Sequence, residues 1–166
     1  LSTAADQVNT ATADSIDASA TARADAGDNV AFRSTDQMLV GVDADVTGNA
    51  DLSLDATATT VGDGSGADVA TASSGSDITE NIGLGLDGGA TTIGRDGRLV
   101  GLAEQTTNAE ATGTTAAADA DAELGQAVGV ELAGQTVSIG QDAQIGAGAL
   151  GSNQAKAVTI DGDADA

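Results

Sequence analysis

Apolar and polar residues alternate strictly along the chain between Val42 and Ala58. Every even position in this stretch is apolar or glycine, and every odd position is polar. Side chains of an extended strand point alternately to its two faces, whereas the apolar residues of an amphipathic helix recur every three or four positions. The pattern therefore predicts β structure with one buried face and one face in solvent. An unbroken strand of this length would span about 55 Å, far beyond the usual strand, so we expect a turn at Gly48-Asn49.

Residues 1–33 show the same alternation. Alanine occupies every even position from Ala18 to Ala26, and Ser, Thr, Arg and Asp lie between. Alanine favours helix, but the period of two favours a strand. Gly27-Asp28-Asn29 supplies a turn. We expect residues 1–33 to form an N-terminal β segment or cap and residues 34–166 to form repeats. The segment after this turn brings together four large side chains, namely Val30, Phe32, Met38 and Val40.

A short motif recurs along the chain at intervals of 21 to 24 residues. It reads Val or Ile, two variable positions, Asn or Asp, a small residue, a variable position and an apolar residue. Self-similarity at a fixed period is typical of solenoid proteins, in which each repeat stacks on its neighbour. The sequence therefore predicts an all-β protein, a parallel β-solenoid (β-roll or β-helix) with ~23-residue rungs, about seven coils and the capacity to form fibres. Clear copies begin at Val46, Ile93, Ile139 and Ile160, and weaker copies at Ala22, Ala70 and Ala116. The buried side chains we expect are the inward apolar residues Leu52, Leu54, Ile93, Leu99, Ile139, Ile145 and Ile160.

If the repeat length is odd, the inward-facing residues have even numbers in one repeat and odd numbers in the next. The alternation of inward and outward residues must therefore break once per repeat, at a corner. Residues that tolerate turns or a positive φ mark such corners. The candidate corners are residues 62–66, 105–108, 125–126 and 151–153.

Composition decides between a folded and a disordered chain. The 166 residues suit one domain, but they include one Phe, one Met, no Trp and no Tyr, and the net charge is -21. Few large apolar side chains and a high net charge are also typical of disorder. A β-solenoid resolves this conflict, because its thin core accepts small side chains and its stability comes from stacking.

The residue types exclude most catalytic chemistry. The chain has no Cys and no His, and Lys156 is its only lysine, so disulfides, thiolate metal sites and the usual acyl-transfer groups are missing. Paired carboxylates can cleave glycosides, but aromatic residues that would stack on a sugar are almost absent. We therefore predict that the protein is not an enzyme. The 26 acidic residues would repel nucleic acid, and no apolar run is long enough to insert into a membrane.

Two acidic patterns make calcium a possible cofactor. Residues 63–69 partly match the calcium-binding nonapeptide GGxGxDxUx, with Asp63 and Asp68 as candidate ligands, although the stretch also suits a plain turn. In the stacking model, side chains at the motif's Asn or Asp position form one column, where a hard cation would relieve repulsion between carboxylates ~4.8 Å apart. Corner caps and solvated charge are the alternatives. The column consists of Asp25, Asn49, Asp96, Asp119, Asp142 and Asp163.

Two stretches, 138–149 and 157–166, resemble the SVAIGxxAxAxG rungs of YadA-like trimeric autotransporter heads. The resemblance covers about a quarter of the chain, and the rungs of that family are shorter than ~23 residues. Those heads are parallel β-rolls on bacterial surfaces that adhere to host matrix. The resemblance implies a surface β-solenoid and assigns no functional residue.

These observations predict a structural subunit of an extracellular or cell-surface filament, sheath or fibre that assembles by end-to-end stacking of its rungs. Its partners would be copies of itself, with residues 158–166 of one copy meeting residues 8–26 of the next, and divalent cations. One alternative is an adhesin head that binds a ligand. Another is a calcium-dependent or ice-binding solenoid, and Thr57, Thr59 and Thr60 suggest the ice-binding form.

Overall fold

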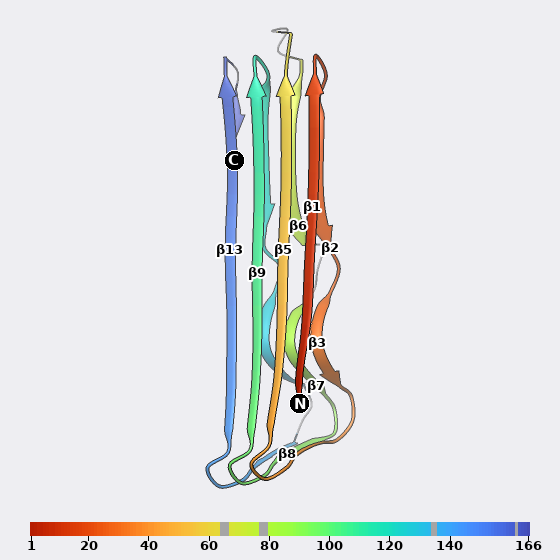
Figure 1. Cartoon of the computed structure of the whole chain (residues 1–166), viewed down its shortest axis with the longest axis vertical. Coiled ribbons are helices and arrows are strands. Elements are labelled where there is room, and N and C mark those ends of the chain that lie inside the picture. Colours follow the sequence, from red (N-terminus) through yellow and green to blue (C-terminus); the bar gives the residue numbers. More distant parts are fainter. Residues whose placement is uncertain (64–66, 77–79, 134–135, 162) are drawn as a thin grey trace.

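The computed structural model describes residues 1–63, 67–76, 80–133, 136–161 and 163–166, which form parallel strands and no helix (Figure 1). The long sheet contains β1 (Ser2–Ile16), β5 (Asp45–Val61), β9 (Arg98–Thr114) and β13 (Gln144–Ile160), side by side in that order. The upper sheet contains β2 (Ala20–Ala26), β6 (Val69–Ser76), β10 (Ala117–Glu123) and β14 (Ala164–Asp165). The lower sheet contains β3 (Asn29–Ser34), β7 (Asn81–Asp87) and β11 (Ala127–Ala133). The corner sheet contains β4 (Met38–Val40), β8 (Ala90–Ile93) and β12 (Thr136–Ile139).

Each coil rises along the long sheet and returns through the three shorter sheets. In Figure 1 the long strands stand in front, the strands of the upper and lower sheets lie behind them, and the corner sheet turns the chain at the bottom. Every strand pairs in parallel with the strand at the same position in the next coil. The predicted parallel β-solenoid is confirmed. No helix long and apolar enough to cross a membrane occurs in the described part of the chain.

The predicted rung length is wrong. Ser2 lies opposite Thr47, Asp45 opposite Arg98, and Arg98 opposite Gln144, so successive coils advance by 45, 53 and 46 residues. The described chain therefore makes fewer than four coils instead of seven. The ~23-residue repeat is about half of a coil, because the rising strand and the returning strands share the same alternating composition.

The turn predicted at Gly48-Asn49 is also wrong, because β5 continues through it. Alternate residues of β5 are buried from Val46 to Thr60, as the period of two predicts. Gly48 serves a different purpose. A Cβ atom there would lie 2.1 Å from the carbonyl oxygen of Gly83, so glycine lets the long and lower sheets approach backbone to backbone.

The core has two parts with different side chains. Between the long and upper sheets it consists mainly of alanine, with Leu52 and Leu54, and this part accounts for the unusual composition. Between the long sheet and the lower and corner sheets it contains larger residues, including Val40, Ile93 and Leu99, with Phe32 and Met38 packed against them. Four of the seven residues expected in the core are buried, namely Leu52, Leu54, Ile93 and Leu99. The other three are exposed, namely Ile139, Ile145 and Ile160.

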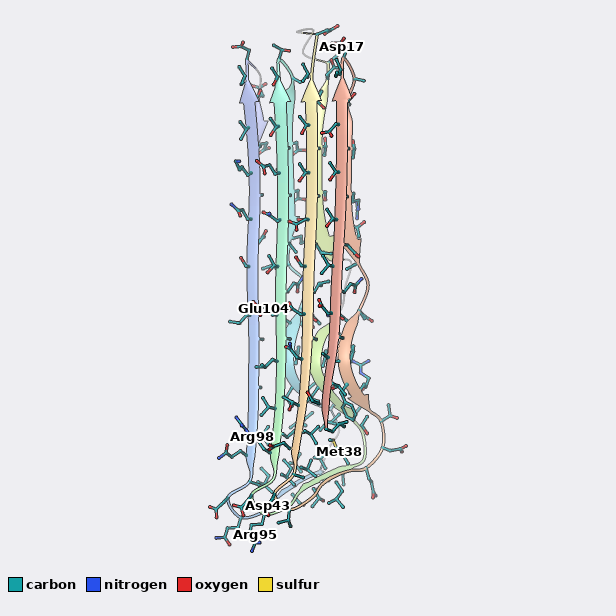
Figure 2. All side chains as sticks on the ribbon, viewed as in Figure 1. Asp17, Met38, Asp43, Arg95, Arg98 and Glu104 are labelled. Atoms are coloured by element: carbon teal, nitrogen blue, oxygen red, sulfur yellow. The ribbon has the colours of Figure 1, made fainter. Side chains whose placement is uncertain are left out.

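Corners occur at both ends of the long strands. At the lower corner, Asp43, Asp96 and Asp142 have φ of 53°, 56° and 60°, a left-handed conformation that Asp tolerates better than most residues. Asp17, Thr115 and Asp161 have the same conformation at the upper corner. Figure 2 shows Asp43 and Arg95 at the lower corner and Asp17 at the opposite end.

The predicted corners have mixed outcomes. Gly125-Gln126 lies between β10 and β11, as expected. Residues 105–108 and 151–153 lie inside β9 and β13, so these two corners are wrong. Gln105 and Thr107 point inward and are buried. Residues 64–66 of the remaining corner lie outside the described residues.

Residues 1–33 are part of the same coil system. They supply β1, β2 and most of β3, which pair with β5, β6 and β7. The boundary between residues 33 and 34 falls within β3.

Candidate assembly interface

The outer edge of β13 has no paired strand among the described residues. The Gln144 N–H donates to the Gly97 carbonyl at 2.9 Å, and the Ile160 carbonyl accepts from the Thr115 N–H at 2.8 Å. In a parallel ladder alternate residues direct their backbone groups to opposite sides. Even-numbered residues of β13 therefore bond to β9, and odd-numbered residues direct their N–H and C=O groups to the free edge.

Core side chains lie uncovered beside this edge. Ile145 stands in register with Leu99, yet Ile145 is 37% exposed and Leu99 is 0% exposed. Ile139 stands in register with Ile93, and their exposed fractions are 57% and 1%. Two of the three isoleucines wrongly expected in the core thus have one cause: Ile145 and Ile139 occupy inward positions of the outermost described strands, which no further coil covers. Ile160 is exposed for another reason, because it shares a level with the exposed Val61 and Ile16 on the solvent-facing side of the long sheet.

The face at this edge is stepped. The long and upper sheets each contain four strands, whereas the lower and corner sheets each contain three. The lower half of β13 therefore extends beyond β11 and β12, and its inward residues Ala147 and Ala149 are exposed.

Charge is unevenly distributed over the long sheet. Asp6, Asp51 and Glu104 are in register on three neighbouring strands, and Leu150 of β13 follows at the same level. Figure 2 labels Glu104 on the exposed face of this sheet. β13 contains no Asp or Glu, and its only charged side chain is Lys156, whose Nζ lies 2.5 Å from Glu110 Oε1. β13 is thus the one long strand without a carboxylate.

The outer edge of β1 is likewise unpaired among the described residues. The Leu1 carbonyl accepts from the Thr47 N–H and the Asp17 N–H donates to the Val61 carbonyl, both at 2.8 Å. Odd-numbered residues of β1 therefore bond to β5, and even-numbered residues face the free edge. β1 carries Asp6 and Asp14 on its solvent-facing side.

The predicted acidic column does not exist as one column. Asp96 and Asp142 occupy equivalent corners, three residues after the paired Ile93 and Ile139, and Asp43 stands at the same place in the first coil. The other four members are scattered because the coil is twice the predicted length. Within the described ranges no three Asp or Glu residues are close enough to hold a metal ion together. The scattered members are Asp25 in β2, Asn49 in β5, Asp119 in β10 and Asp163 before β14.

The second calcium candidate lies in the connection between β5 and β6. The Asp68 carbonyl accepts from the Ala117 N–H at 3.1 Å, and the Asp68 carboxylate lies near Gly62. Asp63 is exposed. Residues 64–66, between the two candidate ligands, lie outside the described residues, and calcium binding stays a prediction.

A cluster of charges that the sequence analysis missed surrounds Arg33 on the lower sheet. Its guanidinium lies 2.5 Å from Glu80, 3.3 Å from Asp87 and 3.7 Å from Glu131. The hydrogen bond with Glu80, followed by the charges of all three carboxylates, raises the pKa of Arg33 although partial burial opposes this. Gly85 lies between Arg33 and Glu131 in the register and leaves room for the arginine to span two coils. The partners are far apart in sequence, so no local pattern indicates the cluster.

Two small hollows lie on the long sheet. One of about 140 Å³ is lined by Asp45, Thr47 and Arg98, and another of about 190 Å³ by Leu102, Glu104 and Leu150. Pockets for small-molecule ligands usually have volumes of about 300–1,000 Å³. Neither hollow is therefore suited to a cofactor, and the free strand edges are the main candidate for function. Comparisons with protein-family models, curated proteins and solved structures find no match to this chain.

Proposed function

We propose that the protein is a structural subunit of an extracellular or cell-surface filament, sheath or fibre, and that it assembles by stacking β-solenoid coils end to end. The observation that carries this proposal is the exposure of Ile145 and Ile139 in columns whose other members are buried. Free strand edges are templates for pairing with another chain. An added strand at this edge would satisfy the backbone groups of β13 and cover Ile145.

The surface supports a location outside the cell. The net charge of -21 keeps such a surface well hydrated, and the resemblance to bacterial surface β-rolls points the same way. A structural role without catalysis is supported by the absence of His and Cys from the chain and by the pairing of its single lysine with Glu110.

Negative-stain electron microscopy and sedimentation over a concentration series test the proposal. Long uniform fibres that grow with concentration are the expected result. Discrete trimers or lollipop-shaped particles would instead favour an adhesin head, and a monomer at every concentration would contradict assembly.

An edge variant tests the same proposal at the β13 edge. Deleting residues 158–166 and adding a Lys-Pro cap shortens the edge and blocks it with a charge and a residue lacking an N–H. Fibres should disappear while a soluble, β-rich monomer remains. The matched control adds Lys-Pro after residue 166 of the intact chain and should still form fibres, because β13 is unchanged.

A further inference from the structure

We infer that the β13 edge docks on the β1 edge of a second copy, parallel and in register, with the copy's Ser2 opposite Gly146. This inference rests on the proposed function and specifies its junction. Within one chain Ser2, Thr47, Val100 and Gly146 share one level of the long sheet, so the junction repeats the register that the molecule already uses.

Backbone hydrogen bonding supports this register. The free groups of β13 belong to odd-numbered residues, and those of β1 belong to even-numbered residues. In a parallel ladder a residue bonds to the two neighbours of the residue directly opposite. With Ala147 opposite the copy's Thr3, its N–H and C=O meet the free groups of the copy's Ser2 and Ala4. A shift by one residue would break this match and turn the core face of the strand outward.

The inward side chains also match. Ala11, Ala56, Ala109 and Ala155 form one four-membered alanine column, and Ala13, Ala58, Ala111 and Ala157 form a second. In the junction the copy's Ala11 continues the first column after Ala155, and its Ala13 continues the second after Ala157. The copy's Leu1 reaches the level of Ile145, one of the uncovered core residues.

The distribution of charge favours the β1 edge of the copy as the partner of the β13 edge. Along the paired strands the junction places the copy's Asp6 beside Leu150, its Thr12 beside Lys156 and its Asp14 beside Val158, so no carboxylate of the copy's β1 meets one on β13. At the upper corner just beyond these strands, the same register places the copy's Asp17 at the level of Asp161. Inside the molecule the same level already brings Asp6, Asp51 and Glu104 together. A strand free of carboxylates is therefore the suitable neighbour for the acidic β1 edge.

The junction continues the long and upper sheets from one copy into the next, but it does not continue the lower and corner sheets. Ala164 of β14 continues the column of Ala20, Ala70 and Ala118, so the copy's β2 can follow it. The lower and corner sheets are one strand shorter, so a slot about one strand wide (~4.8 Å) remains between β11–β12 and the copy's β3–β4. The contact is therefore carried by β13 and β14.

Disulfide trapping tests the register, because the chain contains no cysteine of its own. Val8 and Ser152 are exposed and share one level, but they lie on opposite edges of the sheet, about 14 Å apart within a monomer. A disulfide requires Cα atoms within about 7 Å, so Val8→Cys with Ser152→Cys can cross-link only between copies. Mild oxidation should convert most of this double variant into a ladder of multimers.

Two controls make the result specific. Val8→Cys with Val158→Cys places the thiols six residues apart along the junction, about 20 Å, and should not cross-link. Ser152 is the midpoint of β13, so Ser152→Cys alone would form dimers if two β13 edges paired antiparallel. Dimers of that single variant, or equal cross-linking in the control pair, would overturn the inference.

Failure of the junction and failure of the proposed function give different results. If fibres form without the expected cross-link, the junction is wrong but the proposed function stands. If the wild-type chain stays monomeric, the proposed function fails.

A charge variant provides an independent test that leaves the core intact. Leu150→Asp would place a carboxylate beside the copy's Asp6 and should raise the concentration needed for assembly roughly two- to fivefold. Asp6→Asn in the same chain should restore assembly. Ser152→Asp adds the same charge on the same strand but faces Val8, so it should have a smaller effect. Equal effects of the two Asp variants, or no rescue by Asp6→Asn, would contradict the register.

Discussion

The Asn29 side chain donates a hydrogen bond from Nδ2 to Asn81 Oδ1 at 3.1 Å, which links the first two coils inside the solenoid. Each amide also bonds to the long sheet: Asn29 Nδ2 to the Asp51 carbonyl at 2.9 Å, and Asn81 Nδ2 to the Glu104 carbonyl at 2.8 Å. Asp51 and Glu104 are in register, so the same bond repeats in consecutive coils. In the third coil Ala127 occupies the equivalent position and the ladder stops.

Removal of the second asparagine tests the importance of this ladder. Asn81→Ala removes the hydrogen bonds to the Glu104 carbonyl and from the Asn29 amide in a buried site, so the free energy of unfolding should fall by about 1–3 kcal/mol. Urea denaturation followed by circular dichroism measures the change. Asn49→Ala on the exposed face of β5 is the control and should change stability by less than about 0.5 kcal/mol. Equal losses in the two variants would mean that the ladder has no special role.

Glycine at position 101 should be required by the close approach of two sheets. A Cβ atom there would lie 1.8 Å from the Gly129 carbonyl oxygen, so Gly101→Ala should destabilise the protein by about 1–3 kcal/mol. Gly146→Ala is the matched control on the neighbouring long strand, since its nearest contacts would be Val100 methyl groups at 3.5 Å or more. Thermal unfolding should show a lower Tm for Gly101→Ala and little change for Gly146→Ala.

The left-handed backbone conformation at Asp96 predicts that glycine is tolerated better than alanine at this position. Its φ of 56° disfavours residues with a Cβ atom other than Asn and Asp, so Asp96→Ala should cost about 1 kcal/mol. Asp96→Gly should be tolerated, because glycine adopts this conformation without strain. Denaturant midpoints of the two variants decide the matter. A more stable alanine variant would argue against a conformational role for this residue.

Arg33→Gln tests the charge cluster on the lower sheet. The pairs are partly exposed and screened, so we expect a loss of roughly 0.5–1 kcal/mol that diminishes at high salt. The pKa of Arg33 is raised in the folded state, mainly by Glu80, so its contribution is complete below the ordinary arginine range and is lost only at strongly alkaline pH. The stability difference between wild type and variant should therefore stay constant from about pH 6 to pH 10.

Assembly should depend on ions, because each junction brings together copies with a net charge of -21. Added salt or divalent cations should promote assembly by screening or bridging the carboxylates, and a chelator at low ionic strength should weaken it. Turbidity and electron microscopy across a salt series measure the effect. Assembly that ignores both salt and chelator would exclude any role for bridging ions.

The candidate interface was only partly predictable. The absence of acids from residues 144–160 is visible in the sequence, and the C-terminal strand region was expected to be an assembly edge. The buried or exposed state of Ile139 and Ile145 was not predictable, since both fit the same local pattern as the buried Ile93 and Leu99. Exposure depends on whether another coil lies above the residue, and no local pattern contains that information.

The sequence by itself determined β structure with alternating inward and outward residues and an alanine-rich core, because the alternation of side chains is a local property of an extended backbone. Only the tertiary structure decided the length of a coil. Both halves of a coil have the same period-two pattern, so a repeat of about 23 residues is indistinguishable from a coil of 46 until hydrogen bonds identify the partner of each strand. The same register decided which carboxylates stack, since Asp6, Asp51 and Glu104 become neighbours only when their strands pair.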